Sequence, residues 1–215
     1  MALLFDKVAL ITGASRGVGY AAAKKLCEKF PGATIYLTTK NLEITPALNK
    51  KMRDDFAGAS DHCEYLHLDV ANTENIAQIQ EMIRSRHETL DILINNAGVY
   101  SKPDFSSPEV FGSQATSIIG TNYWGLKNVI NGLRDIFTPG ARIVNMSSHL
   151  GHLSLINGEV KQSQTLRELF ADPNLSEKKL DSMMREFVTA ANAGGWVEAG
   201  WPNCAYTVSK VLKVY

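Results

Sequence analysis

Five short apolar runs alternate with longer amphipathic segments through most of the chain, and this alternation limits the possible folds more than any other feature. The runs are rich in β-branched residues and lie at 7–12, 33–39, 64–70, 90–98 and 141–148. Strands that are almost continuously apolar are typical of a parallel sheet covered on both faces. Alternation with right-handed crossovers therefore predicts an α/β fold, a Rossmann-type doubly wound parallel sheet with helices on both faces.

The segments between the runs have apolar residues at helical spacing. One such segment follows the first strand and carries Val18, Ala22, Leu26 and Phe30. Proline at position 46 starts the next helix, because proline suits the first helical position, and isoleucines at 76, 79 and 83 mark a third. A long helical stretch with apolar residues from 118 to 133 separates the last two strands.

Length favours one domain, and the balance of charge gives no sign of a nucleic-acid or lipid partner. The 215 residues suffice for one α/β domain, 1–215, and are too few for two. Lys plus Arg and Asp plus Glu each number 22, so no net charge attracts nucleic acid or anionic lipid. No apolar stretch approaches the roughly 20 residues of a membrane span, and the cysteines have no metal-ligand spacing. We expect a cytoplasmic protein with neither a nucleic-acid nor a membrane partner and no metal.

Ligands of doubly wound sheets bind beyond the carboxyl ends of the strands, and the first strand ends in a glycine-rich turn. The turn, TGASRGVG, has Gly13, Gly17 and Gly19 in the pattern G-x3-G-x-G. Glycines let the backbone approach a pyrophosphate, and the next helix offers free N–H groups to the anion. A tight turn without a ligand would have a similar pattern. The position of TGASRGVG between a strand and a helix nevertheless favours nucleotide binding.

The end of the second strand indicates which dinucleotide is bound. The segment LTTKN lacks the acidic residue that usually meets free ribose hydroxyls, and Glu43 lies several positions farther on. Lys40 is there instead, and Arg16 lies in the glycine turn. Two cations suit a 2′-phosphate, so the sequence favours NADP(H) over NAD(H), although both side chains could simply be solvated. A methyltransferase, the alternative nucleotide-binding enzyme, would also require an acidic residue near this strand end, so the sequence disfavours it.

Polar residues follow the third and fourth strands. Asp69, before Val70, could accept a hydrogen bond from an adenine amino group or cap the helix that begins near Asn72. The fourth strand ends in NNAG, 95–98, whose small residues would let a cofactor cross closely. Buried amides without partners are costly, so the two asparagines predict a specific network that joins neighbouring strand ends.

Five motifs in order resemble the short-chain dehydrogenase/reductase family: TGASRGVG, NNAG, TNYWG, VNMSS and YTVSK. The long interval from Ser148 to Tyr206, followed by EAGWPNCAY, is similar to the monomeric carbonyl reductase branch. The resemblance implies NADPH-dependent reduction of ketones, aldehydes or quinones by a monomer. It also implies that 149–200 is a helical insert, and apolar spacing there predicts a helix capped by Ser176 and ended by Gly194.

Tyr206 and Lys210 are four residues apart and would be neighbours on one face of a helix, where an ammonium favours the phenolate. The resemblance implies that Tyr206 is the proton donor and that Ser148 holds the carbonyl oxygen. Lys210 would bind ribose hydroxyls, and Asn122 would hold a water that connects Lys210 to solvent. The implied cofactor-binding set is Gly13, Ser15, Arg16, Gly17, Val18, Gly19, Lys40, Asp69, Val70, Asn96, Ala97, Gly98, Tyr206 and Lys210.

The chain stops at Tyr215, before the last strands that members of this family usually have. Two hypotheses follow. The chain is a carbonyl reductase, or it is a truncated and catalytically silent variant that at most binds nucleotide.

Overall fold

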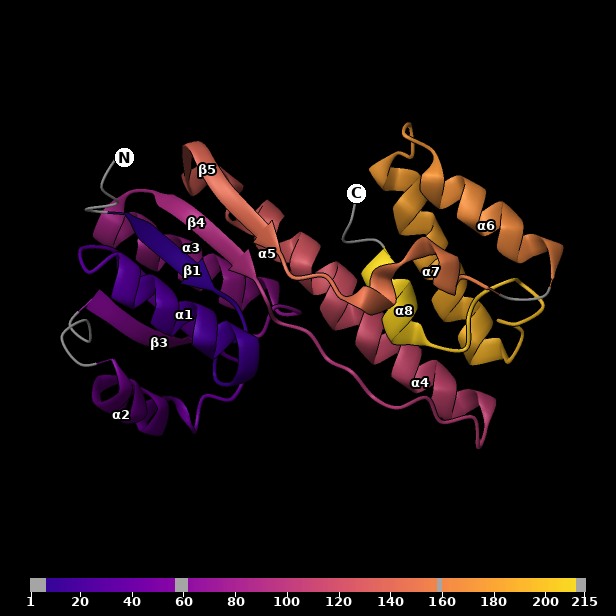
Figure 1. Ribbon diagram of the computed structural model, residues 1–215, viewed down its shortest axis with the longest axis horizontal. Helices are drawn as coiled ribbons and strands as arrows, with labels where there is room; N and C mark the ends of the chain where they lie inside the picture. The colour runs from indigo at the N-terminus through magenta and orange to yellow at the C-terminus, as the bar shows by residue number, and fades with distance from the viewer. Residues whose placement is uncertain (1–6, 57–61, 158–159, 212–215) are drawn as a thin grey trace. The chain divides into compact units, whose positions relative to one another are not determined.

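The computed structural model describes residues 7–56, 62–157 and 160–211, and the chain divides into two compact units (Figure 1). The sheet unit comprises Met1–Ala97 and Gly125–Met146, and the helical unit comprises Gly98–Trp124 and Ser147–Tyr215. That 1–215 is a single domain with an insert at 149–200 stays a prediction.

The sheet unit is built on five parallel strands in the order β3-β2-β1-β4-β5. In register, Ile11 lies opposite Leu37 of β2 and Ile94 of β4. The order reverses direction beside β1, and this is the point where doubly wound sheets bind ligands. The strands are β1 (Val8–Ile11), β2 (Thr34–Thr39), β3 (Cys63–His67), β4 (Leu90–Asn95) and β5 (Phe137–Asn145). The predicted parallel α/β sheet is confirmed, with β5 beginning four residues earlier than expected.

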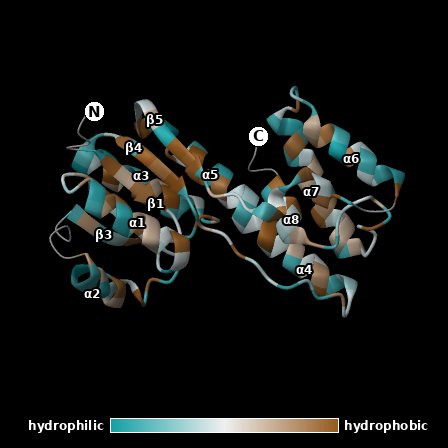
Figure 2. Ribbon diagram, in the orientation of Figure 1, coloured by the Kyte–Doolittle hydropathy of each residue, from teal (hydrophilic) through white to brown (hydrophobic). Residues whose placement is uncertain are grey.

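Helices cover both faces of this sheet because successive strand residues point to opposite sides. Ala9 and Ile11 pack in the cluster formed with α1 (Gly17–Lys29) and α2 (Thr45–Asp55). Val8 and Leu10 pack in the other cluster, with α3 (Thr73–His87) and α5 (Leu126–Gly132), which the short helix η3 (Arg134–Ile136) follows. Strands β1 and β4 are largely hydrophobic along their length (Figure 2). The doubly wound arrangement is therefore confirmed.

The buried face of α1 differs from the apolar positions of the sequence. Val18 is 62% exposed, and the buried residues are Gly19, Ala23 and Cys27. The apolar spacing predicted that larger side chains would face the sheet. A helix that approaches a sheet closely buries its small side chains instead. A Cβ on Gly19 would clash with the side chain of Asn96, which shows how close the approach is.

The helical unit has its own apolar core, which includes Phe111, Phe170, Phe187 and Trp201. Ser176 caps α7, since its hydroxyl accepts from the N–H of Lys179, and Gly194 ends it in the left-handed region at φ 78°; both predictions are confirmed. The elements are α4 (Pro108–Ile119), the π-helical turn η2 (Gly120–Gly125), η4 (His149–Gly151), η5 (Leu153–Leu155), α6 (Lys161–Ala171), α7 (Glu177–Ala193) and α8 (Ala205–Val211). Within the described ranges, no helix has the length and apolar character required to cross a membrane.

Candidate functional site

Side chains at the carboxyl ends of the central strands bond these ends together. The hydroxyl of Thr12, after β1, accepts from the backbone N–H of Asn96 (3.1 Å) and of Ala97 (3.0 Å). In return, the Asn96 side-chain amide donates to the carbonyl of Thr12 at 3.1 Å. Asn95 donates to Asn145 at 2.9 Å and joins β4 to β5. The predicted amide network between strand ends is therefore confirmed.

Two glycines of the turn make room for the NNAG segment. A Cβ on Gly13, whose φ is +64°, would lie 2.7 Å from the Cα of Ala97. A Cβ on Gly19 would lie 2.4 Å from the side-chain nitrogen of Asn96. Both distances are too short for a real side chain. These two glycines are therefore required by the fold itself, in addition to any approach of a phosphate.

The amino terminus of α1 is suited to an anion. Among the described residues no side chain caps it, and its first turn has no acidic residue. By contrast, Asn72 caps α3 and Ser107 caps α4. The uncapped N–H groups of a first turn bind anions well. Ser15 is half-buried and Arg16 is exposed just before this turn, so the residues present fit a phosphate group.

Two residues that the sequence analysis missed hold the glycine turn. The hydroxyl of Tyr65 in β3 donates to the carbonyl of Ala14 at 2.7 Å. Burial raises the pKa of Tyr65, so its hydroxyl keeps the proton that this bond requires. Thr38 in β2 accepts from the N–H of Gly13 at 3.2 Å. The sequence signal that could have identified Tyr65 and Thr38 is that each is a hydrogen-bonding residue inside an otherwise apolar strand.

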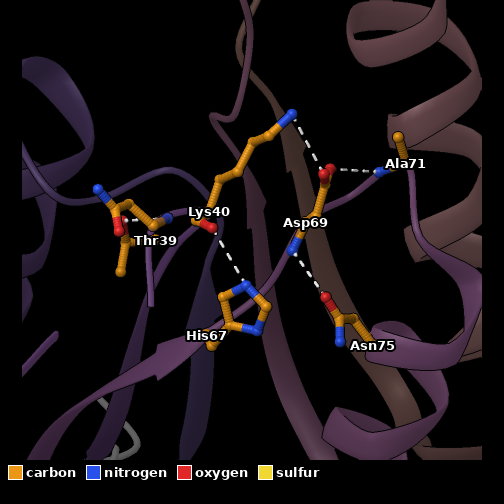
Figure 3. Close-up of polar contacts among 7 residues, drawn as sticks. Thr39, Lys40, His67, Asp69, Ala71 and Asn75 are labelled. Carbon is orange, nitrogen blue, oxygen red and sulfur yellow. Dashed lines mark hydrogen bonds and ion pairs between the residues drawn. The ribbon is translucent and has the colours of Figure 1, made fainter. Parts of the chain in front are cut away.

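The two charged residues expected at the adenine end of a dinucleotide lie against each other (Figure 3). Lys40 Nζ is 3.2 Å from Asp69 Oδ2, and the lysine side chain is 77% exposed. Asp69 also accepts from the N–H of Ala71 at 3.0 Å, while Asn72 caps α3. The helix-cap alternative for Asp69 is therefore wrong. Val70 is buried. An exposed ion pair contributes about 0–1 kcal/mol, so a ligand phosphate can compete for Lys40.

In the helical unit, α8 carries the Tyr206 and Lys210 pair. Lys210 Nζ lies 5.2 Å from the centroid of the Tyr206 ring. Lys210 is buried at 4% exposure, whereas Tyr206 is half-buried. Every other residue of α8 is buried as well. The helix therefore presents its tyrosine as the accessible group, with the ammonium beneath it.

Asn122 lies in the π-helical turn, which interrupts the single long helix expected between the last two strands. Its Oδ1 accepts from the N–H of Val99 at 2.8 Å, and its Nδ2 donates to the Val99 carbonyl (3.0 Å) and to Ser209 Oγ (2.9 Å). A Cβ on Gly98 would lie 3.1 Å from Asn122 Oδ1 and 3.8 Å from Lys210 Nζ. The structure thus gathers Asn122, Gly98 and Lys210. Ser209, which the sequence analysis missed, ties Asn122 to α8.

These bonds limit how Asn122 could hold a water. Both of its amide hydrogens are donated within the protein. A water would therefore be held by the remaining lone pair of Oδ1 or by the main chain of the π-helical turn. Widened turns of this kind are frequent at functional sites because they free backbone groups from the regular helical ladder.

Ser148 precedes η4 and keeps a hydrogen to donate. Its hydroxyl accepts from the N–H of Leu150 at 3.2 Å, which leaves the O–H free in direction. Three residues after Ser148, a Cβ on Gly151 would lie 2.7 Å from the carbonyl oxygen of Lys210. The segment after Ser148 therefore packs closely on α8.

Comparisons with known proteins show the family of the chain and agree with its fold. Residues 7–160 match the family model described as short chain dehydrogenase. Carbonyl reductase [NADPH] 1 of Mus musculus is 31% identical over 204 residues, which are 95% of this chain and 70% of that protein. Carbonyl reductase [NADPH] 3 of Rattus norvegicus is 33% identical over 206 residues, 96% of this chain and 70% of that protein. The solved structure of menthone neomenthol reductase from Mentha piperita is 26% identical with a TM-score of 0.82, and the match covers 95% of this chain and 81% of that one.

Proposed function

Because the chain belongs to the short chain dehydrogenase family, we propose that it is an NADPH-dependent reductase that converts ketones, aldehydes or quinones to alcohols. The observation that carries the proposal is the grouping of Asn122, Tyr206 and Lys210 in the helical unit, with the tyrosine as the accessible member. The relatives named as NADPH carbonyl reductases support the cofactor and the reaction.

Distinct residues would hold the parts of NADPH. The uncapped start of α1 would bind the pyrophosphate, and Arg16 and Lys40 would bind the 2′-phosphate. Asp69 would accept from the adenine amino group, and Lys210 would bind ribose hydroxyls. NADPH, when bound, supplies the hydride for the carbonyl carbon.

The protein supplies the proton and the orientation of the substrate. Tyr206 donates its hydroxyl proton to the carbonyl oxygen as that oxygen gains negative charge. Ser148 holds the same oxygen through its free O–H. The ammonium of Lys210 stabilises the phenolate that remains on Tyr206, because an opposite charge nearby favours the ionised form. Asn122 fixes the segment around Val99 beside this pair.

The proposal extends to assembly and location. The chain acts as a monomer in the cytoplasm, on a small carbonyl compound. Helices α6 and α7 lie in the expected insert and support the monomer, because the resemblance assigns such an insert to the face that other members use for tetramer contacts.

Turnover by the purified 215-residue chain tests the proposal. We expect NADPH absorbance to fall when menadione is added, and Tyr206→Phe to lower this rate about 100-fold or more, because general acid catalysis contributes about 10²–10⁴. NADPH affinity, followed by cofactor fluorescence, should change little. Tyr36→Phe, which removes a hydroxyl bonded to His87 in the sheet unit, is the matched control and should turn over normally.

Two other outcomes have distinct meanings. NADPH binding without turnover of any carbonyl compound would favour the catalytically silent variant. A folded chain that binds no NADPH at millimolar concentration would contradict the proposed reductase function.

A further inference from the structure

Tyr100 is an exposed aromatic residue in contact with the proposed proton donor. The ring centroids of Tyr100 and Tyr206 are 5.2 Å apart, and their planes meet at 85°. This edge-to-face geometry falls within the 4.5–7 Å range that aromatic pairs prefer. Nevertheless, Tyr100 is 60% exposed. Packing within the protein therefore uses only part of its ring, and the remainder is available to a ligand.

The backbone beside Tyr100 is held in place by the site itself. The residue before it, Val99, bonds to the Asn122 side chain through both its N–H and its carbonyl, at 2.8 and 3.0 Å. Asn122 is fully buried and bonded to Ser209 of α8. Tyr100 is thus attached to the element that carries Tyr206, as a positioned residue of a binding site requires.

A hollow lies next to Tyr100 in the helical unit. Its volume is about 230 Å³, and its lining residues include Val99, Tyr100, Ser101, Gln114, Ser117 and Ile118. Sites for drug-sized ligands occupy about 300–1,000 Å³. The smaller hollow suits a compact substrate, and its lining mixes apolar side chains with hydroxyl and amide groups that could receive a second polar atom.

The reaction geometry brings a substrate ring within reach of Tyr100. A carbonyl oxygen that receives the proton must lie about 2.6–3.2 Å from the Tyr206 hydroxyl. A flat ring that bears this carbonyl extends several ångströms farther, and an aromatic ring contacts another favourably in stacked or edge-to-face geometry. A flexible aliphatic chain gains less from the same contact and loses rotamer freedom when it is ordered.

We infer that Tyr100 determines substrate specificity, by giving flat aromatic carbonyl compounds such as quinones a ring to pack against while Tyr206 protonates them. The inference rests on the proposed reductase function. It assigns to Tyr100 a contact with substrate and no part in the proton transfer.

The test compares two carbonyl probes on the full chain. With menadione, Tyr100→Ala should raise KM about five- to tenfold, which is the loss expected for one aromatic contact and its area, and kcat should change less than threefold. With hexanal, an aliphatic aldehyde, both constants should stay within threefold. Tyr100→Phe keeps the ring and should restore the menadione KM to within twofold of the unchanged chain.

Phe105→Ala is the matched control, because Phe105 is also an exposed aromatic residue of this loop but packs on Phe111 and Trp196. It should leave the menadione KM within twofold. An equal loss with both probes in Tyr100→Ala would overturn the inference, since it would mean that Tyr100 merely supports Tyr206. An unchanged menadione KM would overturn it as well. If the unsubstituted chain binds NADPH but reduces neither probe, the reductase function itself fails.

Discussion

At the scale of the residue, the pair formed by Lys40 and Asp69 would, under the proposed function, recognise the adenine end of the cofactor. The two charges are 3.2 Å apart and the lysine is largely exposed, so the pair holds Lys40 at the end of β2 without locking it there. A 2′-phosphate offers more negative charge and more acceptor oxygens than one carboxylate oxygen. Lys40 is therefore placed to exchange Asp69 for that phosphate.

Lys40→Ala should accordingly weaken NADPH binding about tenfold and change NADH binding less than twofold, because only NADPH carries the 2′-phosphate. Cofactor fluorescence titrations at low and high salt would measure both, and the NADPH difference should shrink at high salt. Lys25→Ala, which removes another exposed lysine paired with Glu28 on α1, is the control. Equal losses for the two cofactors would contradict the assignment.

At the scale of the element, the π-helical turn connects the proposed catalytic residue Asn122 to helix α7. Tyr123, next to Asn122, donates to Asp181 of α7 at 2.7 Å. Trp124 lies under Arg185 of the same helix, with the guanidinium carbon 5.0 Å from the ring centroid. The helix in the expected insert thus stabilises the turn that positions Asn122.

Tyr123→Phe should lower the free energy of unfolding by about 1.5–3 kcal/mol, since a hydrogen bond to a charged group is lost. It should also lower kcat severalfold with an unchanged KM for NADPH, because Asn122 loses its neighbour's anchor. Urea denaturation and steady-state kinetics would measure these effects. Tyr36→Phe, the control, should lower the free energy of unfolding and leave kcat unchanged. A stability loss in Tyr123→Phe without any change in kcat would show that the turn needs no anchor.

At the scale of the whole molecule, buried phenols limit stability at high pH. Burial raises the pKa of Tyr65 in the sheet unit. The pKa of Tyr123 in the helical unit is raised mainly by burial and, to a smaller extent, by the hydrogen bond to Asp181. In the unfolded chain both ionise near pH 10. Their folded pKa values lie above that, so their contribution to stability is complete below about pH 10 and is lost as the pH rises further.

Unfolding by urea at pH 8 and at pH 11 should therefore show a drop in stability above pH 10, with a slope of at most about 1.4 kcal/mol per pH unit for each buried phenol. Tyr65→Phe and Tyr123→Phe should each make the drop shallower. If neither substitution changes the slope, other groups cause the alkaline loss.

Local sequence determined much of this protein by itself. Strand runs, helix caps at Ser176 and Gly194, and the polar residues at strand ends could all be predicted, because each depends on periodicity or turn chemistry over a few neighbouring residues. The amide network after β4 was predictable for the same reason, since buried amides must find partners.

Only the tertiary structure decided which distant residues meet. Gly13 leaves room for the backbone of Ala97, which a side chain there would clash with. Asn122 bonds to Ser209, 87 positions later. The buried face of α1, the π-helical turn, the pairing of Lys40 with Asp69 and the contact of Tyr100 with Tyr206 all depend on such meetings. Their energies arise from distances between segments that only the folded chain brings together, and no local pattern of residues encodes those distances.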